Sequence, residues 1–129
     1  ILERYQAESL LKRYAISLSA GVTQVHWLGI QDHQGNDWYW TFMPLTDDRK
    51  KLHFHTYGLM TQKLAGFTHA QKIRDHLYRF SFADKPDVYI GWDKTSIEPL
   101  SPPVTLTTID GTVSQADSIP ESPVFIEAR

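Results

Sequence analysis

The chain contains no cysteine among its 129 residues. This absence excludes disulfides, thiolate zinc sites, iron–sulfur clusters and cysteine nucleophiles, and it leaves the redox compartment and the localisation open. The chain has no apolar run of about 18 residues, so the sequence predicts no membrane-spanning helix. Its formal net charge is only −2, and without a strong basic field we expect no nucleic-acid partner.

The composition that remains is that of a folded protein. Hydrophobic residues make up 41% and charged residues 22% of the chain, which excludes intrinsic disorder. The length suits one compact domain or two small pieces of something larger. Ile1 stands where a methionine is expected, so we expect a truncated or processed chain. No phosphate-binding glycine loop or other cofactor motif occurs, so the sequence predicts no cofactor.

The first half of the chain alternates helical and strand signals. Residues 2–20 carry apolar side chains three to four positions apart, which predicts an amphipathic helix that ends at Gly21. These side chains are Leu2, Tyr5, Leu10, Leu11, Tyr14 and Leu18. Residues 22–30 are rich in β-formers and almost continuously apolar, which predicts a strand buried on both faces. Residues 53–65 return to the helical period and end before Gly66.

The second half of the chain changes to a period of two. Residues 77–82 and 88–92 flank a polar turn and predict a β-hairpin. Residues 104–109 and 112–113 flank Asp110-Gly111, a turn dipeptide. Pro123-Val124-Phe125-Ile126 predicts a closing strand. Residues 68–75 fit either a helical turn or a loop.

These signals together predict an α+β fold. Two helices in the N-terminal half surround one buried strand, as at the end of a barrel, and an antiparallel β-sandwich-like module follows. We place the boundary after Gly66, so that residues 1–66 form the α/β segment and residues 67–129 the β module.

Four groups of residues, in this order, carry a resemblance to a known family. They are Gln6-Ala7-Glu8 with Leu10-Leu11-Lys12-Arg13-Tyr14; Ala20-Gly21-Val22 leading into Val25-His26-Trp27; Tyr57-Gly58-Leu59-Met60 with Leu64-Ala65-Gly66-Phe67; and Val104 to Gly111 with Pro123-Val124-Phe125-Ile126. The order resembles the C-terminal portion of a retaining (β/α)8-barrel glycoside hydrolase of the clan A type with its appended β-sandwich.

The resemblance implies that residues 1–20 correspond to the seventh barrel helix, residues 22–30 to strand eight and residues 53–66 to helix eight. In this family the two catalytic carboxylates follow strands four and seven, and both positions would precede Ile1. A retaining mechanism needs two carboxyl groups about 5 Å apart. We therefore predict no catalytic residue in this chain, which alone should be inactive, whereas the parent protein would hydrolyse or bind glycosides.

Trp27, Gln31 and Asp32 are candidate substrate-binding residues because of that resemblance. Family members often carry an aromatic residue near the end of strand eight, where its ring forms the floor of a sugar subsite. Gln31, Asp32 and His33 would follow at the mouth of the barrel, where active sites open. The alternatives are a buried core tryptophan and an ordinary polar transition from strand to loop.

Trp38, Tyr39 and Trp40 form an aromatic patch inside the long connection. Exposed aromatic clusters usually mark an interface or a binding site, so Trp38 and Trp40 are further candidates for carbohydrate binding. The alternative is that they pack against the missing part of the barrel. His53 and His55 suggest a metal site, but positions two apart on a helix do not face each other, so we predict no metal.

Three functional hypotheses follow. The first is the C-terminal portion of a glycoside-hydrolase-like protein, which closes the barrel and supports carbohydrate binding. The second is a stand-alone module that uses the Trp38–Trp40 patch to bind carbohydrate or protein, and the third is a purely structural domain. Under the first hypothesis the partners are carbohydrate and the rest of the parent chain, and the isolated chain should self-associate through exposed apolar faces.

Overall fold

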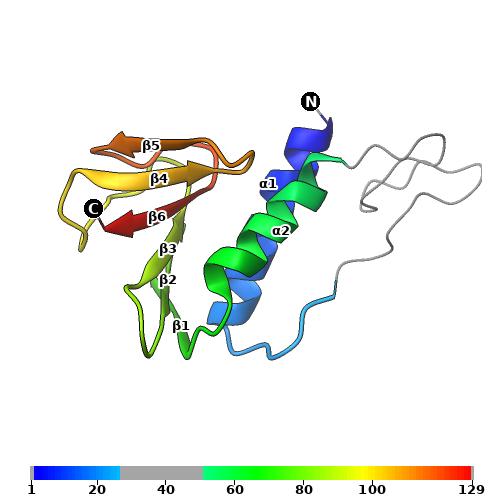
Figure 1. Cartoon of the computed structure of the whole chain (residues 1–129), viewed down its shortest axis with the longest axis horizontal. Helices are drawn as coiled ribbons and strands as arrows, with labels where there is room; N and C mark the ends of the chain where they lie inside the picture. The colour runs from blue at the N-terminus through cyan, green and yellow to red at the C-terminus, as the bar shows by residue number, and fades with distance from the viewer. Residues whose placement is uncertain (1, 27–50, 129) are drawn as a thin grey trace, which may run out of the picture.

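The computed structural model describes residues 2–26 and 51–128, which form two helices and six strands (Figure 1). The helices are α1 (Leu2–Ser19) and α2 (Leu52–Leu64). The strands are β1 (His69–Arg74), β2 (Leu77–Ser81), β3 (Val88–Gly91), β4 (Val104–Thr108), β5 (Val113–Ala116) and β6 (Val124–Ala128). Neither helix is both long and apolar enough to cross a membrane, within the described ranges.

The six strands form one antiparallel sheet in the order β1-β2-β3-β6-β4-β5. The α+β class is therefore confirmed. The β2–β3 hairpin, the β4–β5 hairpin and the closing strand β6 all form where the sequence predicts them. Residues 69–74, whose pattern fits either a helical turn or a loop, form the edge strand β1 instead.

The two helices run parallel to each other. At their first turns the Leu52 backbone N–H donates a hydrogen bond of 3.0 Å to the carboxylate of Glu3. Farther along, the rings of Tyr14 and Tyr57 meet edge to face with centroids 5.9 Å apart. Because Lys51 at the N-cap of α2 makes no side-chain cap, the Glu3 carboxylate serves the N-termini of both helices, where negative charge is favourable.

Both helices cover one face of the sheet, and their apolar sides enter a single core with it (Figure 1). α1 contributes Ala7, Leu10, Leu11, Tyr14 and Ala15; α2 contributes Met60 and Leu64; and the sheet side contributes Tyr78, Phe80, Val88, Ile90, Trp92, Ile109 and Phe125. Polar ties reinforce this packing. The buried Thr56 hydroxyl donates to the Ile109 carbonyl at 2.7 Å, and Lys63 forms a salt bridge with Glu127. The core thus crosses the boundary predicted after Gly66.

The opposite face of the sheet has a core of its own. Its buried side chains are Leu77, Tyr89, Val104, Leu106, Ile119, Val124 and Ile126. Ile97 and Leu100, from the segment between β3 and β4, pack against them, as does Ala116. In the described part of the chain, irregular segments rather than a second sheet supply this layer, so the sandwich assignment stays a prediction.

The glycines at the predicted turns have the backbone conformation that the predictions require. Gly21, Gly66 and Gly111 have φ values of +92°, +81° and +90°, a region in which a Cβ is disfavoured. Gly21 and Gly66 follow the two helices, and Gly111 lies between β4 and β5. Their positions confirm the predicted ends of both helices and the turn of the second hairpin.

Two details of the first half differ from the predictions. Residues 22–26 form no strand, and Val22 is 45% exposed; in the described sheet no strand lies beside them to provide a hydrogen-bonded ladder. The remainder of the predicted strand, residues 27–30, lies outside the described residues. Tyr5, predicted on the buried face of the first helix, is 60% exposed because α1 turns that flank away from both α2 and the sheet.

Gly91 is required by close packing rather than by its backbone angle. A Cβ at this position would lie 3.1 Å from the Ile119 side chain and 3.2 Å from those of Leu77 and Ile126. All three belong to the core on the face opposite the helices. The side chains of Ile119, Leu77 and Ile126 can therefore pack this closely over β3 because position 91 has no side chain.

We predict opposite effects of alanine at two glycines. Gly91→Ala should lower the free energy of unfolding by about 1–3 kcal/mol, because the added methyl overpacks three buried side chains. Gly58→Ala, in the middle of α2 with open space around its Cα, should raise it by about 1 kcal/mol. Urea unfolding of both variants measures the difference, and equal effects would contradict the packing argument.

Candidate functional site

The five predicted binding residues are not in the described part of the structure. Trp27, Gln31, Asp32, Trp38 and Trp40 all lie between residues 27 and 50. His33 and Tyr39 lie there too. The described residues that lead into this connection are Val25 and His26.

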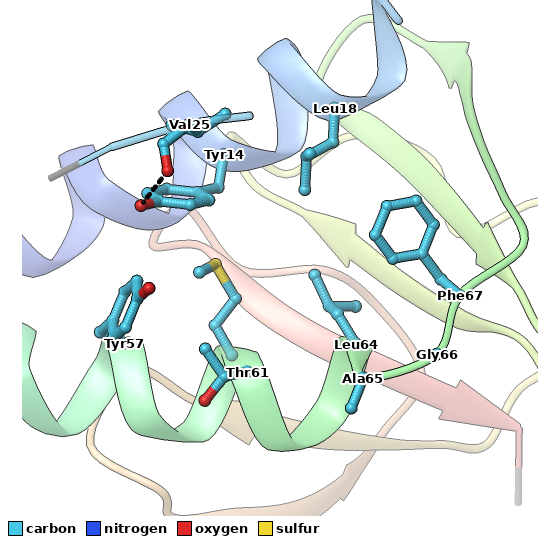
Figure 2. Close-up of a pocket in the computed structure, with 10 residues that line it drawn as sticks. Tyr14, Leu18, Val25, Tyr57, Thr61, Leu64, Ala65, Gly66 and Phe67 are labelled. Carbon is cyan, nitrogen blue, oxygen red and sulfur yellow. Dashed lines mark hydrogen bonds between the residues drawn. The ribbon is translucent and has the colours of Figure 1, made fainter. Parts of the chain in front are cut away.

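Residues 22–26 turn back along α1 toward its N-terminus, as the position of Val25 beside Tyr14 shows (Figure 2). The Tyr14 hydroxyl donates a hydrogen bond of 3.3 Å to the Val25 carbonyl. This bond fixes the start of the connection between the helices over the C-terminal half of α1. His26 follows as an exposed residue.

An apolar pocket opens beside this contact, between the C-terminal halves of the two helices (Figure 2). Its volume is about 370 Å³. It is lined by Tyr14, Leu18, Val25, Tyr57, Met60, Thr61, Leu64, Ala65, Gly66 and Phe67. The polar atoms that reach it are mainly hydroxyls, and that of Thr61 already donates to the Gly58 carbonyl at 2.8 Å. The described lining residues are mostly apolar and include no carboxylate, so this part of the pocket is suited to holding an apolar group.

Tyr14 is the electrostatically perturbed residue of this pocket. Burial raises the pKa of its phenol to about 12, and the neighbouring Tyr57 contributes to this rise through its charge and its hydrogen bond. Both effects disfavour the phenolate. At neutral pH Tyr14 therefore remains a hydrogen-bond donor, which is the role that it has toward Val25.

A second, polar cleft lies between α1 and the sheet side. It has a volume of about 330 Å³ and is lined by Arg4, Glu8, Lys12, Asp93, Glu121 and Ser122. The Ser122 hydroxyl donates to the Glu8 carboxylate at 2.7 Å and accepts from Arg4 at 3.2 Å. Arg4 and Glu8 also form a salt bridge of 3.4 Å. Arg4 and Glu8 are thus hydrogen-bonded to Ser122 and paired with each other, and these contacts attach α1 to the loop before β6.

Trp92, beside this cleft, is a structural tryptophan. It is 3% exposed, and its ring stacks on Tyr78 with centroids 5.4 Å apart. Lys12 lies 5.8 Å from the centroid of the Trp92 ring, within the range of a cation–π contact. Trp92 therefore offers no open face on which a sugar ring could stack.

His53 and His55 lie on different sides of α2, as their spacing requires. His53 is fully buried, whereas His55 is exposed. Among residues 2–26 and 51–128, no three histidine, aspartate or glutamate side chains gather in an arrangement suited to a metal ion.

The pocket between the helices is not predicted by the sequence. Its residues follow the helical period, which by itself indicates packing. The feature that marks the pocket is the contact between Tyr14 on α1 and Tyr57 on α2, which is apparent only once the relative direction of the two helices is known. A scan against protein-family models and searches of curated proteins and solved structures gave no match to this chain.

We predict that the Tyr14 phenol deprotonates at a higher pH than an exposed tyrosine. Because its folded-state pKa is raised to about 12, its contribution to stability is complete below its unfolded pKa near 10 and is lost as pH rises toward 12. Phenolate absorbance followed during an alkaline titration should show a late component that becomes smaller in Tyr14→Phe. Part of that component should remain in the variant, because burial also raises the pKa of Tyr78. A Tyr5→Phe variant, with its exposed ring, is the control and should retain that component.

Proposed function

We propose that this chain is the C-terminal portion of a glycoside-hydrolase-like protein. In this proposal α1, the connection between the helices, and α2 close a (β/α)8 barrel, and the antiparallel sheet is the domain appended to it. The chain supports carbohydrate binding through Trp27, Gln31, Asp32, Trp38 and Trp40. The catalytic carboxylates lie elsewhere in the parent protein.

The parallel arrangement of α1 and α2 is the observation that carries the proposal. Two consecutive helices joined by a short loop pack antiparallel. A parallel pair instead requires the chain to return along the whole first helix, about 27 Å for 18 residues at 1.5 Å each. A strand that runs back beneath the helices is how α/β proteins make this return. Residues 22–26 form no strand, but they turn the chain back toward the N-terminus of α1, since Val25 already lies beside Tyr14.

The flank of α1 that faces away from α2 and from the sheet also supports the proposal. Tyr5 is 60% exposed and Ile16 is 48% exposed. Their spacing of about three turns places them on the same side of the helix. Val22, at 45% exposure, follows shortly after the helix. Ser9 and Lys12 lie on the same side of α1, so the flank is mixed in polarity, and a preceding barrel helix would bury its two apolar side chains.

The proposal gives the predicted residues distinct roles. Trp27 would provide an aromatic floor for a sugar ring, since the C–H face of a pyranose packs on an indole. Gln31 and Asp32 would hydrogen-bond to sugar hydroxyls. Trp38 and Trp40 would extend the aromatic wall. None of these roles breaks a bond, so the chain alone lacks hydrolytic activity.

The first test uses the intact product of the encoding gene. We expect a protein several times longer that hydrolyses aryl glycosides with retention of anomeric configuration, because the second carboxylate acts as a nucleophile. Trp27→Ala in that protein should raise KM for oligosaccharides, while Trp92→Phe, at a buried position, should not. A gene product that begins at or near Ile1 and leaves glycosides intact would overturn the proposal.

A stand-alone binding module is the second candidate. The observation that favours it is the single core shared by both helices and the sheet, because such a unit can fold without further partners. In this case the isolated chain itself would recognise carbohydrate or protein through Trp38 and Trp40.

Tryptophan fluorescence distinguishes this second candidate. The chain has four tryptophans, and Trp92 is buried against Tyr78. If the module binds sugar, titration with a mixture of short oligosaccharides should change the emission. The change should disappear in Trp38→Ala or Trp40→Ala and persist in Trp92→Phe. A change that depends on Trp92 alone would exclude the aromatic patch as the binding site.

A further inference from the structure

β5 lies at one edge of the sheet and is exposed along most of its length. It comes last in the strand order, and Figure 1 shows it at the edge of the sheet, away from both helices. Val113 is 62% exposed, and Ser114 and Gln115 are exposed as well. Such an edge presents unpaired backbone groups to any strand that approaches it.

The hydrogen bonds between β4 and β5 show which backbone groups point outward. Thr108 N–H donates to the Thr112 carbonyl at 2.9 Å, which marks this position as one where β4 and the chain leading into β5 bond to each other, while the Thr112 N–H donates to the Asp110 carboxylate. In an antiparallel ladder hydrogen-bonded positions alternate with non-hydrogen-bonded ones. Ser114 therefore bonds toward β4, opposite Leu106. Val113 and Gln115 direct their N–H and C=O groups away from the sheet.

The two edges of the sheet differ in their protection. β1, at the other edge, carries His69, Lys72 and Arg74, and its register shifts between Lys72 and Arg74. Cationic side chains, bulges and very short strands are among the features that keep an edge strand from pairing with another chain. β5 is short, at four residues, but its sequence Val-Ser-Gln-Ala has no charge and no proline, and its register with β4 is regular.

We propose that β5 pairs antiparallel with β5 of a second copy of this chain, about a two-fold axis at Ser114. In this register Val113 faces Gln115 of the partner subunit, and each such pair exchanges two hydrogen bonds. Ser114 faces its own copy in a non-hydrogen-bonded pair. The two sheets would become one continuous sheet. This pairing does not rest on the proposed function.

We choose a second copy of the chain as the partner of β5 because two β5 strands can pair without bringing like charges of the strands together. Val113–Ala116 carries no charge, so two copies meet without repulsion, whereas β1 would bring like charges together. In the register centred on Ser114, Asp117 lies across from Gly111 and not from its own copy. Ser114 is also small, which suits the close Cα approach of about 4.5 Å in a non-hydrogen-bonded pair.

A single cysteine at the axis tests the register. The chain has no cysteine, so Ser114→Cys introduces one thiol per copy, and a non-hydrogen-bonded pair brings the two Cα atoms within disulfide reach. Under mild oxidation we expect a covalent dimer of doubled mass. Lys72→Cys, at the protected edge, is the matched control and should stay free of covalent dimer under the same conditions.

Charge substitutions at the same position test whether this edge carries the dimer. By light scattering on a sizing column, the unmodified chain should have twice its monomer mass. Ser114→Lys alone and Ser114→Asp alone should each lose the dimer, because like charges then face each other, and their mixture should regain it. Far-UV circular dichroism checks that both variants fold. A monomeric unmodified chain, or a Ser114→Lys variant that stays dimeric through another surface, would overturn the proposal.

Discussion

The parallel packing of α1 and α2 on one face of the sheet is the constraint on which the rest of the structure depends. Leu10 and Leu11 on α1 and Phe80 and Phe125 on the sheet are fully buried in one core. Neither layer can cover its apolar face without the other. Thr56 ties α2 to the end of β4, and Lys63 ties it to β6, so the helix pair is held to the sheet along its length.

The elements with a strong period are predictable from sequence, and those without one are not. Both helices have apolar residues at three- to four-residue spacing. The strands of the hairpins have a period of two and are joined by polar turns. β1 lacks such a signal. Its Ala70 and Ile73 pack into the two different cores, and the irregular register after Lys72 breaks the alternation. A strand of this kind is defined by its neighbour β2 and not by its own residues.

The candidate site shows the same division. Trp27, Trp38 and Trp40 are candidates because of a family resemblance and their residue type, and both are properties of the sequence alone. The pocket between the helices depends on the relative direction of α1 and α2, which no local pattern encodes. Tyr5 and Tyr14 show a different limit of the prediction. Both are assigned to the predicted apolar face, yet Tyr5 is exposed and Tyr14 is buried against Tyr57, because their separation of nine residues places them on opposite sides of α1.

The shared core also holds the residues at which the connection between the helices begins and ends. The connection between the helices starts at Val25, which is bonded to α1 through Tyr14, and it ends at α2, whose first amide is bonded to Glu3 of α1. Both ends of the connection are thus fixed on the same helix, and that helix is fixed on the sheet. The described residues on either side of the connection are therefore placed by the same core that holds α1 on the sheet.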